Sequence, residues 1–113
     1  MEIQFSSRTL ARSCNSEKEL SRTWGRQRGR LIARRLQQLS AATSLKEMEF
    51  LPAAKFHALK GSRAGQFAVD ADYPYRLVFV VVHNPAPIRS NGGIDLGRVT
   101  KIKVIEVINY HDD

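Results

Sequence analysis

Two nearly continuous apolar runs constrain the fold of this chain most strongly. Residues 78–82 read VFVVV, and residues 104–108 read VIEVI. Short runs rich in β-branched residues are typical of central strands that are covered on both faces. Four strands are therefore predicted in the second half of the chain, over residues 56–60, 66–71, 75–83 and 101–111.

Turn-forming residues separate these predicted strands. Residues 61–65, GSRAG, indicate a tight hairpin turn, and residues 72–74, DYP, indicate the next turn. Residues 84–100 are dense in Pro, Gly and Asn and predict a long hairpin loop. Residues 2–6 alternate polar and apolar side chains, which indicates one further short strand near the start of the chain.

The sequence between the first strand and residue 56 favours helices. A short helix is expected over about residues 9–14. Ser16, followed three residues later by Glu19, has the form of a capping box, so a second helix should begin just after Ser16. Gly25 and Gly29 each weaken the middle of that helix by about 1 kcal/mol relative to alanine. We expect one long helix with an irregularity at the glycines.

The predicted order of elements is β-α-α-β-β-β-β. This order indicates an α+β fold in which two N-terminal helices pack on a mostly antiparallel sheet. The 113 residues suffice for one domain with one core, spanning residues 1–113. No apolar run approaches the roughly 20 residues that cross a bilayer, and no secretory signal is evident, so no membrane partner is expected. Cys14 is the only cysteine, which fits a reducing compartment, and the expected localisation is cytoplasmic.

Charge is distributed unevenly along the chain. The formal net charge is +7 at pH 7, and residues 1–63 hold 13 Lys and Arg against 5 Asp and Glu. Residues 64–113 hold 5 against 6. One strongly basic half is typical of proteins that bind polyanions, nucleic acid above all. A surface that only keeps the protein soluble is the alternative.

Arginines at steps of four mark one face of the long predicted helix. They are Arg22, Arg26, Arg30 and Arg34, and Arg28 and Arg35 widen the ridge that they form. Like charges at this spacing repel one another unless a polyanion neutralises them. The spacing therefore predicts a phosphate-binding ridge for RNA. A solvated face, or a surface for an acidic partner protein, fits the same spacing.

Polar side chains with catalytic potential gather at the ends of the predicted strands. They are His57, Lys60, Arg63, Arg76, Tyr110 and His111. RNA cleavage by internal attack of the 2′-OH needs a base, an acid and cations that stabilise the charged phosphate. These residue types suffice without a metal, and no GxxxxGK, HExxH or CxxC pattern occurs, so neither a cofactor nor a metal is expected. His57 and Lys60 have opposite parity on a strand, which places Lys60 in the turn beside Gly61.

Three segments carry a resemblance to a known family. They read FHALKGSRAGQF from residue 56, YRLVF from residue 75 and EVINYH from residue 106. In this order they resemble the RelE superfamily of toxins, and most of all its HigB-type "plasmid maintenance killer" branch. The resemblance implies the toxin of a bacterial type II toxin-antitoxin system. Such a toxin cuts messenger RNA in the ribosomal A site and leaves a 2′,3′-cyclic phosphate and a 5′-OH.

The resemblance also implies residue roles and partners. His57 and Lys60 fall on positions that contribute to proton transfer and charge stabilisation, and Arg76 falls on the arginine that contacts the scissile phosphate. Tyr110 and His111 fall on a terminal pair that orients the cleaved nucleotide. The implied partners are the ribosome with its messenger and a cognate antitoxin, HigA-like and of the helix-turn-helix class. Operator DNA would be bound only through that antitoxin.

The remaining motif positions include one match and two departures. Arg63 matches the family motif and is assigned to contact with the RNA backbone. The strand over residues 67–72, with Asp70 and Asp72, is acidic where many relatives place an arginine that helps catalysis, and Asn109 stands where many carry an acidic residue before the Tyr-His pair. An acid beside a phosphate site is unfavourable through Coulomb repulsion, so either Asp70 points away or the activity is altered. The alternative function is therefore a weak or inactive module of the same fold that binds RNA, the ribosome or an antitoxin.

Overall fold

The computed structural model describes residues 1–109, and a five-stranded sheet forms its centre. The strands are β1 (Glu2–Phe5), β2 (His57–Ala58), β3 (Gln66–Asp70), β4 (Tyr75–Val81) and β5 (Lys101–Asn109). Their order across the sheet is β1-β5-β4-β3-β2. β1 pairs with β5 in parallel, and the other pairs are antiparallel. The α+β class and the mostly antiparallel sheet are thus confirmed.

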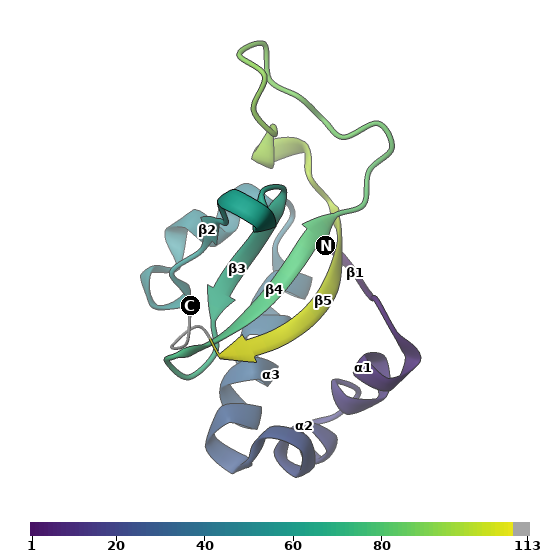
Figure 1. The fold of residues 1–113 in the computed structure, drawn as a ribbon, viewed down its shortest axis with the longest axis vertical. Helices are drawn as coiled ribbons and strands as arrows, with labels where there is room; N and C mark the ends of the chain where they lie inside the picture. The colour runs from purple at the N-terminus through teal and green to yellow at the C-terminus, as the bar shows by residue number, and fades with distance from the viewer. Residues whose placement is uncertain (110–113) are drawn as a thin grey trace.

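Three α-helices precede β2. They are α1 (Arg8–Ser13), α2 (Glu17–Trp24) and α3 (Arg26–Ala41). Two short 3₁₀-helices, Leu45–Phe50 and Pro52–Ala54, lead from α3 to β2. α3 crosses behind the sheet in the view of Figure 1, and within residues 1–109 no α-helix covers the side that faces the viewer. We call that side the helix-free face.

The prediction of one long helix after Ser16 is wrong, because the chain turns back at Gly25. Gly25 has φ 91° and ψ 160°, a conformation open essentially to glycine alone. Its N–H donates to the Ser21 carbonyl at 2.9 Å and closes the end of α2. At Gly29, an added Cβ would lie 2.8 Å from the Leu20 carbonyl carbon. The two glycines therefore make the turn and the close helix contact, and three α-helices instead of two precede β2.

The core lies between the sheet and α3. Ile32 and Leu39 of α3 are fully buried, as are Leu77 and Phe79 of β4. Val78, whose side chain points to the opposite face from these two β4 residues, is also 0% exposed. The prediction that the central apolar strand is covered on both faces is confirmed for this part of β4.

Arg35 belongs to the interior, not to the predicted arginine ridge. It is 6% exposed, and its Nε donates to the Asp70 carbonyl at 2.7 Å. Nη1 donates to Gln38 Oε1 at 3.1 Å, and Nη2 donates to the Ala53 carbonyl at 3.1 Å. Desolvation by burial lowers the pKa of Arg35 below its ordinary value, and the charge of Arg34 lowers it further. Arg35 therefore ties α3 to β3 and to the segment before β2.

The long hairpin loop over residues 84–100 is confirmed. It extends beyond the end of the sheet (Figure 1), and one isolated bridge joins Ile88 to Ile94. At its base, His83 Nε2 accepts a hydrogen bond from the Thr100 N–H at 2.9 Å. None of the helices within residues 1–109 is long and apolar enough to cross a membrane.

Candidate functional site

Strand register gathers several of the predicted site residues on the helix-free face. One cross-strand row over β2, β3, β4 and β5 consists of His57, Ala68, Val78 and Glu106. The next row over the last three of these strands consists of Asp70, Arg76 and Ile108. Paired residues point to the same face of a sheet, and Leu77 and Phe79 point into the core. Both rows therefore lie on the helix-free face.

His57 has a defined tautomer at one end of the first row. Its Nδ1 lies 2.8 Å from the Lys55 carbonyl. A carbonyl only accepts, so Nδ1 must carry the proton, and the neutral ring keeps a lone pair on Nε2. His57 is half-buried, and this tautomer suits a general base.

Lys60 lies in the turn after β2, as predicted from the fact that His57 and Lys60 would point to opposite faces of a regular strand. β2 ends at Ala58, and the 3₁₀ turn Gly61–Arg63 begins directly after Lys60. Gly61 has φ 63°, a left-handed conformation that favours glycine. Lys60 is exposed, so its ammonium is accessible to a phosphate at the edge of the sheet.

Arg76 forms an ion pair with Asp70, whose acidic strand differs from the pattern of many RelE relatives. Its Nε lies 3.4 Å from Asp70 Oδ1, and the two side chains are 26% and 11% exposed. The two residues are direct cross-strand partners on β3 and β4. Asp70 therefore does not point away from the site, and it balances the charge of the arginine assigned to the phosphate.

Arg63 reaches from the turn onto the same face and meets a second carboxylate. Its Nη2 lies 2.6 Å from Glu106 Oε1, and its Nη1 donates to Gln66 Oε1 at 2.8 Å. Glu106 was not among the predicted site residues. The available signal was that it is the one charged residue inside the apolar run VIEVI.

In each of the two arginine–carboxylate pairs, a carboxylate balances the charge of the guanidinium group. Ion pairs that remain partly exposed contribute only about 0–1 kcal/mol each, because water screens them. The Arg63–Glu106 pair is of this kind, with side chains 31% and 38% exposed. A phosphate group that approaches the face has to compete with Glu106 and Asp70 for the two guanidinium groups.

Tyr110 and His111 lie outside the described residues, so their predicted roles stay predictions. The described part of β5 ends at Asn109, whose cross-strand partner is Tyr75. Asn109 is thus positioned on the strand next to β4 and one register step beyond the Arg76 row.

The predicted arginine ridge is divided between two helices. Arg26, Arg30 and Arg34 are exposed on α3 at helical steps of four, and we call these three the α3 ridge. Arg22 lies on α2 instead, 3.7 Å from Glu19. Arg28 is not part of the α3 ridge either, because its guanidinium packs on the Tyr75 ring, 3.6 Å from the ring centre.

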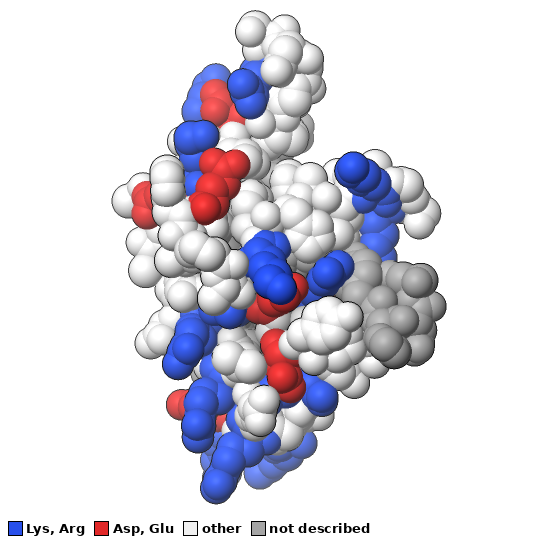
Figure 2. Space-filling model, turned by 90° about the vertical axis from the view of Figure 1, so that its left-hand side faces the viewer, with Lys and Arg blue, Asp and Glu red and all other residues white. Residues whose placement is uncertain are grey.

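The surface shows where charge gathers. In Figure 2, basic side chains dominate the lower part of the view, while basic and acidic side chains lie next to each other nearer its centre. Within residues 1–109, no group of three or more His, Cys, Asp or Glu side chains is placed to hold a metal ion. The charged chemistry of the described surface is therefore that of arginine, lysine and paired carboxylates.

In comparisons with known proteins, no family model matches the chain, and no curated protein or solved structure matches it. The resemblance to the RelE superfamily rests on the three sequence segments. The first spans β2, the turn after it and the start of β3, the second lies in β4, and the described part of the third ends β5. The sheet order therefore brings all three segments onto adjacent strands.

Proposed function

We propose that this chain is the toxin of a bacterial type II toxin-antitoxin system, of the RelE/HigB-like kind. In this proposal it is a metal-independent mRNA endoribonuclease that acts at the ribosomal A site in the cytoplasm. The observation that carries the proposal is the placement of His57, Arg63 and Arg76 on one helix-free sheet face, supplied by β2, the turn after it and β4. Cleavage by 2′-OH attack requires a base, cations and an acid, and this face supplies the base and the cations.

The proposed reaction follows from the tautomer of His57. Its Nε2 takes the proton from the 2′-OH, and the 2′-oxygen attacks the adjacent phosphorus. Arg76 and Lys60 stabilise the negative charge that accumulates on the phosphate oxygens. The bond to the 5′-oxygen then breaks, that oxygen gains a proton, and a 2′,3′-cyclic phosphate and a 5′-OH remain. By resemblance, Tyr110 and His111 orient the nucleotide, and in this proposal His111 supplies that proton.

The α3 ridge supplies the proposed docking surface for ribosomal RNA. Successive arginines of the ridge are about 6 Å apart along the helix axis. α3 carries no acidic residue in its first turn, and the ridge arginines are exposed. Lysine and arginine contacts to phosphates fix the position of a protein on RNA without reading its sequence. Arg63 adds a backbone contact next to the cleavage site.

The proposed protein partner is a cognate antitoxin of the helix-turn-helix class, HigA-like, and operator DNA is contacted only through it. The basic first half of the chain supports an acidic or polyanionic partner. A small helix-turn-helix protein encoded beside this gene would support the assignment.

Growth of expressing bacteria tests the proposed function. The wild type, Arg76→Ala and His111→Ala are induced in parallel. Arg98→Ala is the matched control, because it replaces an exposed arginine of the long loop. The wild type and Arg98→Ala should arrest growth, and the other two should not. If the wild type leaves growth and translated messages unchanged, the enzymatic proposal fails.

A second candidate is a non-catalytic module that binds RNA, the ribosome or an antitoxin. The Asp70–Arg76 and Arg63–Glu106 pairs favour it, since each phosphate-binding arginine already has a counter-ion. Sedimentation with ribosomes separates the two candidates. Ribosome binding without new 5′ ends on the messenger would support the second one.

A further inference from the structure

β1 is an edge strand with an unoccupied hydrogen-bonding side. It is the last strand in the sheet order, so within residues 1–109 only β5 pairs with it. The Glu2 N–H donates to the Thr100 carbonyl and the Ser6 N–H donates to the Val104 carbonyl, each at 2.9 Å. Backbone groups of a strand alternate in direction, so those of Ile3 and Phe5 point away from β5. An edge of this kind is a template for a further strand.

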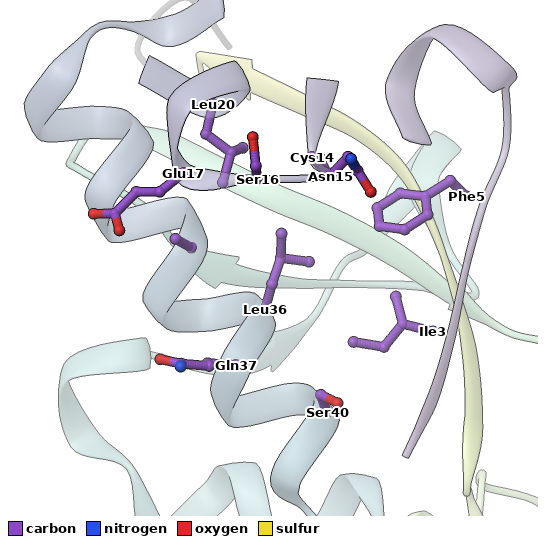
Figure 3. A pocket seen from close by; sticks show the side chains of 11 residues that line it. Ile3, Phe5, Cys14, Asn15, Ser16, Glu17, Leu20, Leu36, Gln37 and Ser40 are labelled. Atoms are coloured by element: carbon purple, nitrogen blue, oxygen red, sulfur yellow. The ribbon is translucent and has the colours of Figure 1, made fainter. Parts of the chain in front are cut away.

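An apolar groove adjoins this edge. It has a volume of about 480 Å³ and lies between β1, α3 and the connection from α1 to α2. Its apolar lining comprises Ile3, Phe5, Leu20, Ala33 and Leu36. Figure 3 shows Ile3, Phe5 and Leu36 pointing into the space between the strand and the helix. The two β1 residues with outward backbone groups therefore also supply the apolar wall.

A half-buried cysteine lies in the wall of the groove. Cys14 lines it, and desolvation by burial raises the pKa of the Cys14 thiol to about 11. The thiol therefore stays protonated at neutral pH. An apolar side chain that enters the groove gains the free energy of burial against Ile3, Phe5 and Leu36.

The surroundings of the groove are basic. Arg8 and Arg12 are exposed on α1, and α1 has no acidic residue. Arg30 and Arg34 of the α3 ridge lie three residues before Ala33 and Gln37, which line the groove, and residues three apart are neighbours on a helix surface. Glu17 is the one charged residue of the described lining. The rim of the groove on α3 is therefore basic, while the lining itself holds one carboxylate.

We propose that β1 and this groove bind an extended, acidic segment of a partner protein, which adds to the sheet as a strand. Main-chain hydrogen bonds to Ile3 and Phe5 hold the segment, and every second side chain enters the apolar groove. Acidic residues of this same alternate set, at the ends of the segment, meet Arg30 and Arg34 along the rim.

This surface is separate from the candidate cleavage site. β1 and β2 are the two outer strands of the sheet, and four strand spacings of about 4.8 Å place them roughly 19 Å apart. The groove also opens on the side of the helices, whereas His57 and Arg76 lie on the helix-free face. A partner on β1 therefore leaves the helix-free face uncovered but occupies Arg30 and Arg34, two of the three arginines of the α3 ridge. The proposal stands whether or not the chain cuts RNA.

Nuclear magnetic resonance with defined peptides tests this proposal. The probe is a peptide of about eight residues in which every second side chain faces the groove. These groove-facing residues are glutamate at both ends and valine between them, with serine at the other positions, and the control replaces each glutamate by lysine. The glutamate peptide should shift the amide signals of Ile3 and Phe5 and leave that of His57 unchanged. The lysine peptide should bind at least about tenfold more weakly, since the rim arginines repel it.

Two variants locate the contact. Ile3→Pro removes an outward N–H and leaves the N–H groups that face β5 in place, and Leu36→Asp puts a charge into the groove. Each should weaken binding of the glutamate peptide by at least about tenfold, a loss of about 1.4 kcal/mol. Thr23→Asp places the same charge on exposed α2 outside the groove and should bind as the wild type does. Circular dichroism establishes that each variant is folded.

Three results would overturn the proposal that β1 and the groove bind an acidic segment. If millimolar glutamate peptide leaves the Ile3 and Phe5 signals in place, or if the folded Ile3→Pro and Leu36→Asp variants both bind it normally, the proposal is overturned. A dimer in light scattering that dissociates in Leu36→Asp would also overturn it, because a second copy of the chain would then occupy the groove.

Discussion

Replacing Gly29 by alanine tests the tight packing of α2 against α3. The added Cβ would lie 2.8 Å from the Leu20 carbonyl carbon, 2.8 Å from the Ser21 nitrogen and 2.9 Å from the Ser21 Cα. All three are backbone atoms, so no side-chain rotation relieves the contact. α2 has to move away from α3, and Leu20, which is 2% exposed, moves with it.

The expected loss of stability follows from two opposing effects. In an unobstructed helix, alanine in place of glycine stabilises by about 1 kcal/mol. Forcing an extra carbon into a packed contact costs about 1–3 kcal/mol, and a contact with rigid backbone belongs at the upper end of that range. The net result is a loss of about 2 kcal/mol, which lowers the Tm of a domain of this size by about 8 °C.

Thermal and urea unfolding followed by circular dichroism measure this change. Gly97→Ala is the matched control, because an added Cβ there meets only the Asp95 and Lys46 side chains, at 3.6 and 3.9 Å. It should change stability by less than about 0.5 kcal/mol. If Gly29→Ala raises the Tm instead, the two helices do not pack in this way, and one continuous helix is the better description.

Three further predictions concern burial and charge. Arg35→Met leaves the Asp70 and Ala53 carbonyls without their donor and should cost about 2–4 kcal/mol in urea unfolding, whereas an unchanged midpoint would place Arg35 at the surface. The pKa of Cys14 is raised from 9.0 to about 11 in the folded protein, so its contribution to stability is full below pH 9.0 and is lost as the pH rises towards 11. Cys14→Ala should flatten this alkaline decline, and an equal decline in both proteins would contradict the burial of the thiol. Changing the α3 ridge to glutamine should reduce the slope of log Kobs against log salt for single-stranded RNA by about 2, and an unchanged slope would remove the ridge from the RNA contact.

Most strands could be predicted because their signals are local. The apolar run at residues 78–82 and the turn residues at 61–65 and 72–74 fixed β4 and its neighbours to within about two residues at each end. The helix break could not be predicted in the same way. Helix propensity treats Gly25 and Gly29 as equally weak positions, whereas the turn and the helix contact that they make depend on Leu20 and Ser21, which pack against them only in the folded chain.

The positions of site residues could be predicted where the alternation of side chains along a strand decides them. They could not be predicted where distant segments of the chain meet. The parity of His57 and Lys60 assigned one to a strand and the other to the turn, as observed. The spacing of Arg35 gave no sign of its burial, since its partners come from β3 and from residue 53. The Arg63–Glu106 pair joins a turn to β5 across the sheet, so it requires the register of four strands.

Mapping the 5′ ends of messenger RNA in translating cells tests the central claim most directly. The claim is that Arg76 and its neighbours on the helix-free face cut RNA on the ribosome. After induction of the wild type, new 5′-OH ends should appear within translated codons, and they should be absent with Arg76→Ala and present with Arg98→Ala. If the wild type and Arg76→Ala give the same 5′ ends as uninduced cells, the chain does not cut messenger RNA.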